Sequence, residues 1–160
     1  MLEAVRANPG VHLRELERLT ALPFGTLRHH VAALERRGEV RSEQDLRFRR
    51  YYVTGLAPSQ RAAALAMRSR PLRRILAHLI DHAPARHRDL VAALGIPPSS
   101  LSTYLRRLVQ LGLLRDVGAE GFAPTDLVPL RTALASVQPT PLDRLVDAAL
   151  GLFEQTERRP

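Results

Sequence analysis

The amino-acid sequence predicts a mainly α-helical chain built from two copies of one small unit, in which three helices are followed by a β-hairpin. When the 160-residue sequence is shifted by 74 residues, residues 8–41 align with residues 82–115 without a gap. Each copy places leucine and valine at the spacing of a single helix face. In each copy a glycine then precedes a short strand, a polar tip and a returning strand.

The two copies match at residue types with distinct structural roles. Apolar, proline and glycine positions coincide, and chance rarely aligns such a set over this length. The matched pairs are Arg14 with Arg88, Leu16 with Leu90, Pro23 with Pro97, Leu27 with Leu101, Leu34 with Leu108, Gly38 with Gly112 and Arg41 with Arg115. We therefore interpret the sequence up to residue 125 as one supersecondary unit used twice.

The first copy predicts a short helix over 2–7, which ends before Pro9 and Gly10. Two further helices follow, separated by a tight turn over 21–23. Their apolar faces consist of Leu13, Leu16 and Leu19 in the second helix, and of Leu27, Val31 and Leu34 in the third. Gly38 ends the third helix, and strands are expected over 40–43 and 48–53.

The second copy repeats this order, with a longer first helix over 71–82. Its helices present Leu72, Ile75, Leu76 and Leu79, then Leu90, Val91 and Leu94, and then Leu101, Leu105 and Leu108. A turn is expected over 95–97, and strands over 113–117 and 122–123. The opening helix of the first copy is about one turn shorter, so that either the domain tolerates a short helix or a longer natural protein begins before Met1.

This order of elements resembles the winged helix-turn-helix, and the match is close to MarR- and ArsR-like regulators and to prokaryotic proteins with two winged helices in tandem. The residues that carry the resemblance are 9–16, 22–31, 34–38, 51–54 and, in the second copy, 90–114. The resemblance implies a mainly α fold with small β-hairpin wings, with two winged helix-turn-helix domains in tandem plus C-terminal helices. The expected parts are 1–58, a basic helical connector over 59–70, 71–125 and a helical tail over 126–160.

Charge and composition favour a polyanionic partner, with nucleic acid ahead of a membrane surface. The chain has 24 basic residues, all of them arginine, against 16 acidic residues, and a pI of about 11.3. Arginine presents a planar fork that suits phosphates and base edges. The absence of cysteine excludes disulfides and thiolate chemistry. No apolar run approaches the ~20 residues that span a bilayer, and the first residues lack a signal peptide, so we expect a cytoplasmic protein.

The N-terminal ends of the two third helices are the expected DNA contacts, because that end of a recognition helix reaches base edges in the major groove. In the first copy these residues are Phe24, Gly25, Thr26, Arg28 and His29. In the second copy they are Pro98, Ser99, Ser100, Ser102, Thr103 and Arg106. Arg28 is suited to guanine and Phe24 to a thymine methyl. The alternative is that these side chains only solvate the helices.

The two predicted hairpin tips differ in charge. The first, over 44–50, contains Arg47, Arg49 and Arg50, which suit phosphates or a narrow minor groove. The second, over 118–121, has no cation and carries Glu120. We therefore expect the first copy to be the main DNA reader, and the second to bind DNA weakly or to serve as a platform.

The connector and the histidines allow competing interpretations. Arginines gather over 59–74, either as a solvated helix face or as a phosphate clamp between two DNA readers. His78 and His82 have the i, i+4 spacing of a metal pair, but nothing obvious completes a site, and His30 is expected to be packed. Because no catalytic motif stands out, we predict no enzyme activity, no metal and no cofactor.

The tail predicts two helices separated by Pro139-Thr140-Pro141. The first spans 126–137, with Thr125 or Asp126 as its cap and Pro129 in its first turn. The second spans 142–154, and its apolar face consists of Leu142, Leu145, Val146, Ala149, Leu152 and Phe153. This face either covers the second domain or, as we favour, joins two chains into a homodimer.

The leading hypothesis is a double-stranded DNA-binding transcriptional regulator that uses tandem winged helices. One alternative is a protein-interaction scaffold of the chromosome-segregation type. The other is a nonspecific, chromatin-like DNA-coating protein that contacts only the backbone. The positive charge favours DNA binding over the scaffold, because a scaffold requires neither net +8 nor an arginine-bearing wing.

Overall fold

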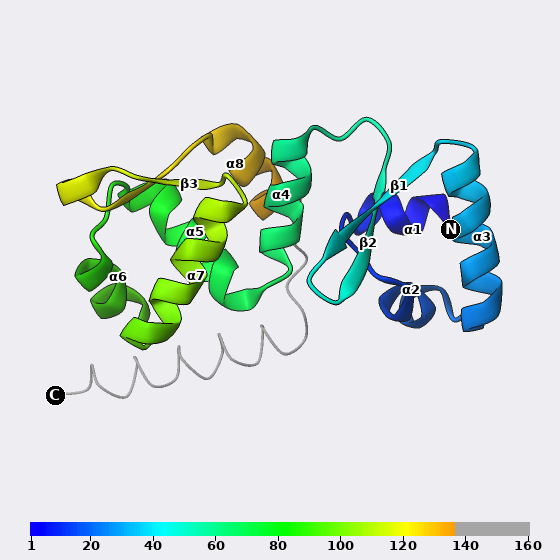
Figure 1. The fold of residues 1–160 in the computed structure, drawn as a ribbon, viewed down its shortest axis with the longest axis horizontal. Helices are drawn as coiled ribbons and strands as arrows, with labels where there is room; N and C mark the ends of the chain where they lie inside the picture. The colour runs from blue at the N-terminus through cyan, green and yellow to red at the C-terminus, as the bar shows by residue number, and fades with distance from the viewer. Residues whose placement is uncertain (137–160) are drawn as a thin grey trace, which may run out of the picture.

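Two helical domains lie side by side in the computed structural model, which describes residues 1–136 (Figure 1). The first domain consists of α1 (Leu2–Ala7), α2 (Leu13–Thr20), α3 (Phe24–Arg36), β1 (Val40–Asp45) and β2 (Phe48–Val53). The second consists of α4 (Pro58–Met67), α5 (Arg70–His82), α6 (His87–Leu94), α7 (Pro98–Gln110), β3 (Leu114–Asp116), the 3-10 turn η1 (Gly118–Glu120), β4 (Phe122–Pro124) and α8 (Leu127–Ser136).

The predicted repeat is present in the structure in the same register. Helices α2 and α6, and likewise α3 and α7, begin and end at positions 74 residues apart, and so do the first residues of β1 and β3. The turn before α3 contains Ala21 with φ 54°, and the equivalent turn before α7 contains Gly95 with φ 62°. Gly38 and Gly112 follow the two long helices with φ 70° and 71°. The left-handed backbone that glycine favours is therefore needed at both helix ends.

The core of the first domain lies under α3. Its stripe of Leu27, Val31 and Leu34 is at most 5% exposed and packs with Val5, Val11, Leu16, Val40 and Tyr51. A backbone bridge from Val11 to Tyr51 attaches the loop before α2 to the hairpin. Each fully buried leucine of this kind contributes ~1.5–3 kcal/mol. Burial of this stripe fixes which face of α3 points to solvent.

The core of the second domain includes the predicted connector. Ala63, Ala66 and Met67 of α4 are buried together with Ile75, Leu76 and Leu79 of α5 and with the α7 stripe of Leu101, Leu105 and Leu108. Helix α8 packs against α4 and α5, and buries Leu130 completely. Helix α4 is therefore packed into the second domain.

Helix α8 matches the first helix predicted for the tail. The side chain of Asp126 accepts a hydrogen bond from the Val128 backbone N–H at 2.9 Å, which satisfies a free donor of the first turn. Pro129 lies in that turn, as predicted, and is buried. The second predicted tail helix, over 142–154, lies outside the described residues. No helix among residues 1–136 is long and apolar enough to cross a membrane.

The two hairpins differ in length although they begin at equivalent residues. The first pairs six residues of each strand, from Val40 with Val53 to Asp45 with Phe48. The second pairs three, from Leu114 with Pro124 to Asp116 with Phe122. A side chain at Gly121 would overlap the backbone carbonyl of Ala85, to which the Phe122 N–H donates at 2.9 Å. Glycine at this position therefore lets the second hairpin close against the loop before α6.

Candidate nucleic-acid interface

Helices α3 and α7 present their polar N-terminal residues to solvent because their apolar stripes are buried. In α3 the side chains of Phe24, Thr26, Arg28 and His29 are exposed, as is Gly25, with Phe24 at 41%. In α7 the exposed predicted residues are Pro98, Ser99, Ser102, Thr103 and Arg106, and Ser100 is half-buried. In Figure 1 the N-terminal ends of both helices point to the lower side of the view, and the tip of the first hairpin points the same way.

A groove of about 550 Å³ lies between α3 and the first hairpin. Four of the predicted DNA contacts line it, namely Gly25, Arg28 and His29 from α3 and Arg49 from β2. Its remaining walls are Leu13, Val31, Ala32, Glu35 and Tyr51. The structure thus brings part of the recognition helix and part of the wing into one solvent-facing site.

Arg49 is held in this groove by two acceptors. Its Nε donates to the Ser42 hydroxyl at 2.7 Å, and a terminal nitrogen donates to the Glu35 carboxylate at 2.9 Å. Its guanidinium carbon also lies 5.9 Å from the centre of the Tyr51 ring, and burial raises the pKa of that phenol. The arginine remains 59% exposed. A positioned, still accessible guanidinium suits a phosphate or a base edge.

The first wing is tighter than the sequence indicated. Its strands extend to Asp45 and resume at Phe48, so the turn consists only of Leu46 and Arg47. Both residues are exposed, and the guanidinium of Arg47 lies 5.2 Å from the centre of the Phe48 ring. Arg47 is therefore the arginine that this turn presents.

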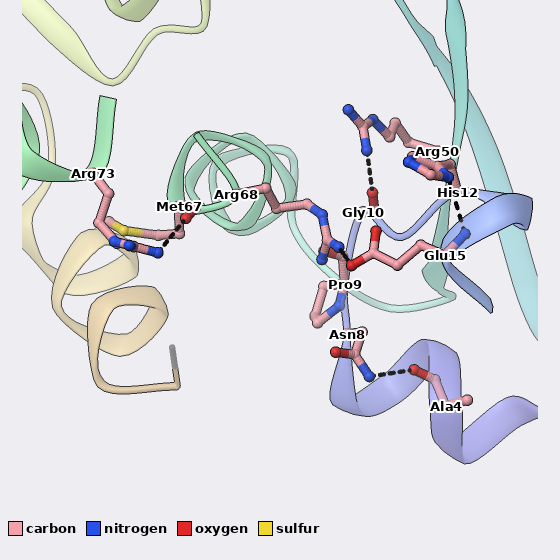
Figure 2. A network of polar contacts seen from close by, with 10 residues as sticks. All are labelled: Ala4, Asn8, Pro9, Gly10, His12, Glu15, Arg50, Met67, Arg68 and Arg73. Atoms are coloured by element: carbon pink, nitrogen blue, oxygen red, sulfur yellow. Dashed lines mark hydrogen bonds and ion pairs between the residues drawn. The ribbon is translucent and has the colours of Figure 1, made fainter. Parts of the chain in front are cut away.

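The expectation that Arg50 shares an exposed tip with Arg47 and Arg49 is wrong. Adjacent residues of a strand point to opposite faces, so Arg49 and Arg50 diverge. The Arg50 side chain is only 14% exposed; it pairs with Asp45 at 3.5 Å and donates to the Gly10 carbonyl at 3.3 Å (Figure 2). Its contacts make Arg50 a packing residue at the inner face of the hairpin.

Ion pairs that the sequence did not indicate join the two domains. Arg61 of α4 pairs with Glu43 of β1 at 2.7 Å, and Arg107 of α7 pairs with Asp45 at the end of β1. Arg68, just after α4, pairs with Glu15 of α2 and also donates to the Pro9 carbonyl at 3.3 Å (Figure 2). The first wing therefore lies against the second domain.

These contacts correct both interpretations for Arg61 and Arg68, whereas Arg70 and Arg74 of the same segment are exposed. Arg61 is 9% exposed, and the side chain of Arg68 is 20% exposed. Neither residue lies on a solvated helix face, and both are engaged with acceptors of the first domain. Since their partners belong to the first domain, these arginines instead set the relative position of the two domains.

The polar residues of α7 are partly engaged within their own domain. The Ser102 hydroxyl donates to the Pro98 carbonyl at 3.0 Å and also lies 3.0 Å from the His87 Nε2. The Thr103 hydroxyl donates to the Ser99 carbonyl at 3.2 Å. Such bonds to the preceding helical turn leave these hydroxyls mainly as acceptors. The nearby Arg106 is exposed, while the second wing presents Glu120.

The histidines differ from one another in their surroundings. His30 is exposed, which corrects the expectation that it is packed. The rings of His78 and His82 stack with centres 4.5 Å apart, and burial, followed by the neighbouring His82, lowers the pKa of His78. Within residues 1–136, no group of three or more metal-ligating side chains occurs.

Comparison with protein families supports the architecture independently. A family model described as an N-terminal HTH domain matches residues 1–64. A second, described as winged helix-turn-helix DNA-binding, matches residues 68–115. No curated protein matches the chain. Together with the fold, the two family matches support a DNA-binding protein with tandem winged helix-turn-helix domains; a specific relation to the MarR- or ArsR-like regulators stays a prediction.

Proposed function

We propose that this chain is a transcriptional regulator that binds double-stranded DNA in a sequence-dependent manner, with the first domain as its main reader. The observation that carries the proposal is the groove lined by Arg28, His29 and Arg49. It combines a side chain suited to guanine with a cation suited to the backbone, and both face solvent.

The contacts within the protein support a division of labour between the domains. Arg28 occupies the repeat position of Ser102, so the first recognition helix offers a bidentate donor where the second offers a hydroxyl. Arg47 and Arg49 give the first wing two exposed cations, whereas the second wing presents Glu120. In this proposal Ser99, Ser100, Ser102, Thr103 and Arg106 make weaker, mostly backbone-directed contacts.

The ion pairs between the domains favour a fixed spacing of the two readers. Glu43, Asp45 and Glu15 of the first domain all pair with arginines of the second. Because these pairs hold α3 and α7 in one relative position, we expect a DNA site with two parts at a constant separation.

The direct test is selection from a random pool of duplex DNA by the full chain, followed by sequencing. The proposal predicts enrichment of a motif whose stronger part depends on Arg28. Uniform retention of all duplexes would instead identify a nonspecific DNA-coating protein. Failure to bind duplexes at low salt would favour the protein-interaction scaffold, because arginine–phosphate contacts are strongest under that condition.

We also propose that the chain acts as a homodimer through the apolar residues predicted at 142–154. The support is sequence alone, in that these residues place six apolar side chains on one helical face. A dimer joined there would match a two-fold related DNA site. Sedimentation of the intact chain beside a chain that ends at Val137 tests this: the intact chain should be a dimer and the shorter one a monomer. The same mass for both would contradict it.

A further inference from the structure

A cleft of about 520 Å³ separates the two domains on the side where α2 faces α4 and α8. One wall consists of the loop after α1 and of His12, Glu15 and Arg18. The opposite wall consists of side chains from residues 56–73 and from α8. Figure 2 shows the boundary between the walls, where Glu15 and Arg68 meet. The volume lies in the range of small-molecule sites, which are commonly found between domains.

Positive charge dominates the polar lining of this cleft. Arg18, Arg50, Arg68 and Arg73 line it, against the carboxylate of Glu15. Arg68 and Arg50 direct donors to the carbonyls of Pro9 and Gly10, and the Nε of Arg50 faces the Asp45 carboxylate at 3.5 Å. A guanidinium offers five N–H donors, so Arg68, which bonds to Glu15 and to the Pro9 carbonyl, retains capacity for an added acceptor. The positive charge of the lining therefore favours an anionic ligand.

The remaining surface of the cleft is apolar. Leu56 and Ala64 of the second-domain wall, the buried Met67, and Pro129 and Ala133 of α8 contribute it. An inorganic ion would leave this surface uncovered. A ligand with an apolar body and one anionic group would cover it and place its charge near the arginines.

We propose that the cleft between the domains binds a small carboxylate with an apolar body, and that this ligand controls the relative position of the two DNA readers. The carboxylate competes with Glu15 for Arg68, and thus acts on an ion pair that joins the domains. Occupancy of the cleft therefore changes the spacing of α3 and α7. The control of DNA binding rests on the proposed function, whereas the binding of the carboxylate does not.

The test of binding uses the full chain without DNA. Sodium benzoate and sodium hexanoate are the probes, and benzamide and hexanamide are the matched neutral controls. We expect the two carboxylates to raise the unfolding temperature as their concentration rises, and the two amides to leave it unchanged. In NMR spectra, shifts of backbone amides should concentrate at Gln60, Ala64 and Thr132, which line the cleft. Equal responses to acids and amides, or shifts spread over the surface, would overturn the proposal.

Two variants locate the site and one serves as a control. Arg18→Gln removes a charge of the lining from an exposed position of α2, and we expect it to weaken carboxylate binding at least fivefold. Arg14→Gln removes the same charge from the same helix outside the lining, and binding should not change. Ala64→Leu fills the cleft without a change in charge, and it should weaken binding too. If Arg14→Gln and Arg18→Gln weaken binding equally, the carboxylate responds to net charge and the proposal is wrong.

Control of DNA binding is measured separately on a selected duplex. We expect saturating benzoate to lower the affinity of the full chain at least fivefold, which is the lower end of typical allosteric coupling. The same concentration should have little effect on Arg18→Gln. Binding of benzoate with no change in DNA affinity would overturn the control of spacing. If the proposed sequence-dependent DNA binding is itself wrong, the selection will enrich no duplex. That result is distinguishable from a duplex that is bound with the same affinity with and without benzoate.

Discussion

Arg28 on α3 and Ser102 on α7 occupy one position of the repeat, on helices of equal length and with equivalent buried faces. What surrounds them is different. Arg28 faces a groove shared with Arg49 of the wing, whereas Ser102 bonds to its own helix and to His87. The backbone arrangement of the repeat and its exposed binding surface can therefore vary independently. Burial of the apolar stripe fixes the position of the helix, whereas the exposed residues are free to differ.

The two hairpins also differ in length and in what they contact. The longer first hairpin carries Glu43 and Asp45 to the second domain, where they pair with Arg61 and Arg107. The shorter second hairpin ends in η1 and exposes Glu120. Extra strand residues therefore convert a wing of this kind into a bridge between domains.

The largest expected effect follows from breaking that bridge. Asp45→Asn should lower the free energy of unfolding by about 3 kcal/mol, because it leaves the largely buried Arg50 and the half-buried Arg107 without their charged partner. Asp116→Asn is the matched control, since Asp116 also ends the first strand of its hairpin but is exposed. It should change stability by less than about 0.5 kcal/mol. Urea unfolding of the full chain measures both, and equal losses would refute the bridge.

The next effect concerns the wing tips. Arg47→Ala should weaken binding to all duplexes alike and reduce the slope of log affinity against log salt by about 1, as expected for one lost phosphate contact. Glu120→Ala, the counterpart at the second tip, should leave the slope unchanged or raise affinity slightly. Salt titrations of DNA binding measure both variants. A greater loss for Glu120→Ala would mean that the domains are assigned in reverse.

A smaller effect tests the shared turn before each recognition helix. Ala21 and Gly95 have nearly equal positive φ values, and a side chain at Gly95 would meet no atom within 4 Å. Gly95→Ala should therefore cost about 1 kcal/mol, and Ala21→Gly should gain about 0.5 kcal/mol. Thermal unfolding of the two variants checks the opposite signs. Changes of the same sign would show that the turns are not equivalent.

The smallest effect is a pH dependence that belongs to the first domain. The His12 Nδ1 accepts the Glu15 backbone N–H at 3.2 Å and so caps α2, whereas Arg86 at the repeat position provides no side-chain cap for α6. Burial, and the arginines near it, lower the pKa of His12 below 6.5, although Glu15 opposes this. The unfolded chain therefore takes up this proton more readily than the folded chain, and stability falls as the pH drops below about 6.5.

His12→Asn keeps a capping side chain and removes this titration. Between pH 8 and pH 5 its stability should fall less than that of the wild type. Some fall should persist, because the pKa of His78 is lowered as well. Urea unfolding across the pH range checks this. Identical curves for the two proteins would exclude His12 as a contributor.

The helices and their turns could be predicted because their signals are local. Leu27, Val31 and Leu34 mark a helix face by spacing alone, and all three are buried. The groove contacts Gly25, Arg28 and His29 could be predicted as exposed for the same reason, since the buried stripe fixes the opposite face. Whether they contact DNA stays a prediction.

The contacts of the charged residues could not be predicted, because their partners lie far apart in the chain. Arg68 is 53 residues from Glu15, and Arg107 is 62 residues from Asp45. The face of the strand to which Arg50 points depends on the position of the hairpin turn. Leu46 adopts φ 51° although leucine gives no signal for such a turn, and this places Arg50 on the inner face of the strand. His30 was expected to pack, yet it is exposed, whereas Tyr104 at the same repeat position is half-buried.

Whether the first domain is the main DNA reader is tested most directly by the affinities of Arg28→Ala, Ser102→Ala and the wild type for a selected duplex and for a scrambled one. We expect Arg28→Ala to lower affinity for the selected duplex by ~1–3 kcal/mol with little change on the scrambled duplex. Ser102→Ala should preserve most of the preference. If Arg28→Ala leaves the preference intact, or if Ser102→Ala removes more of it, the first domain is not the main reader.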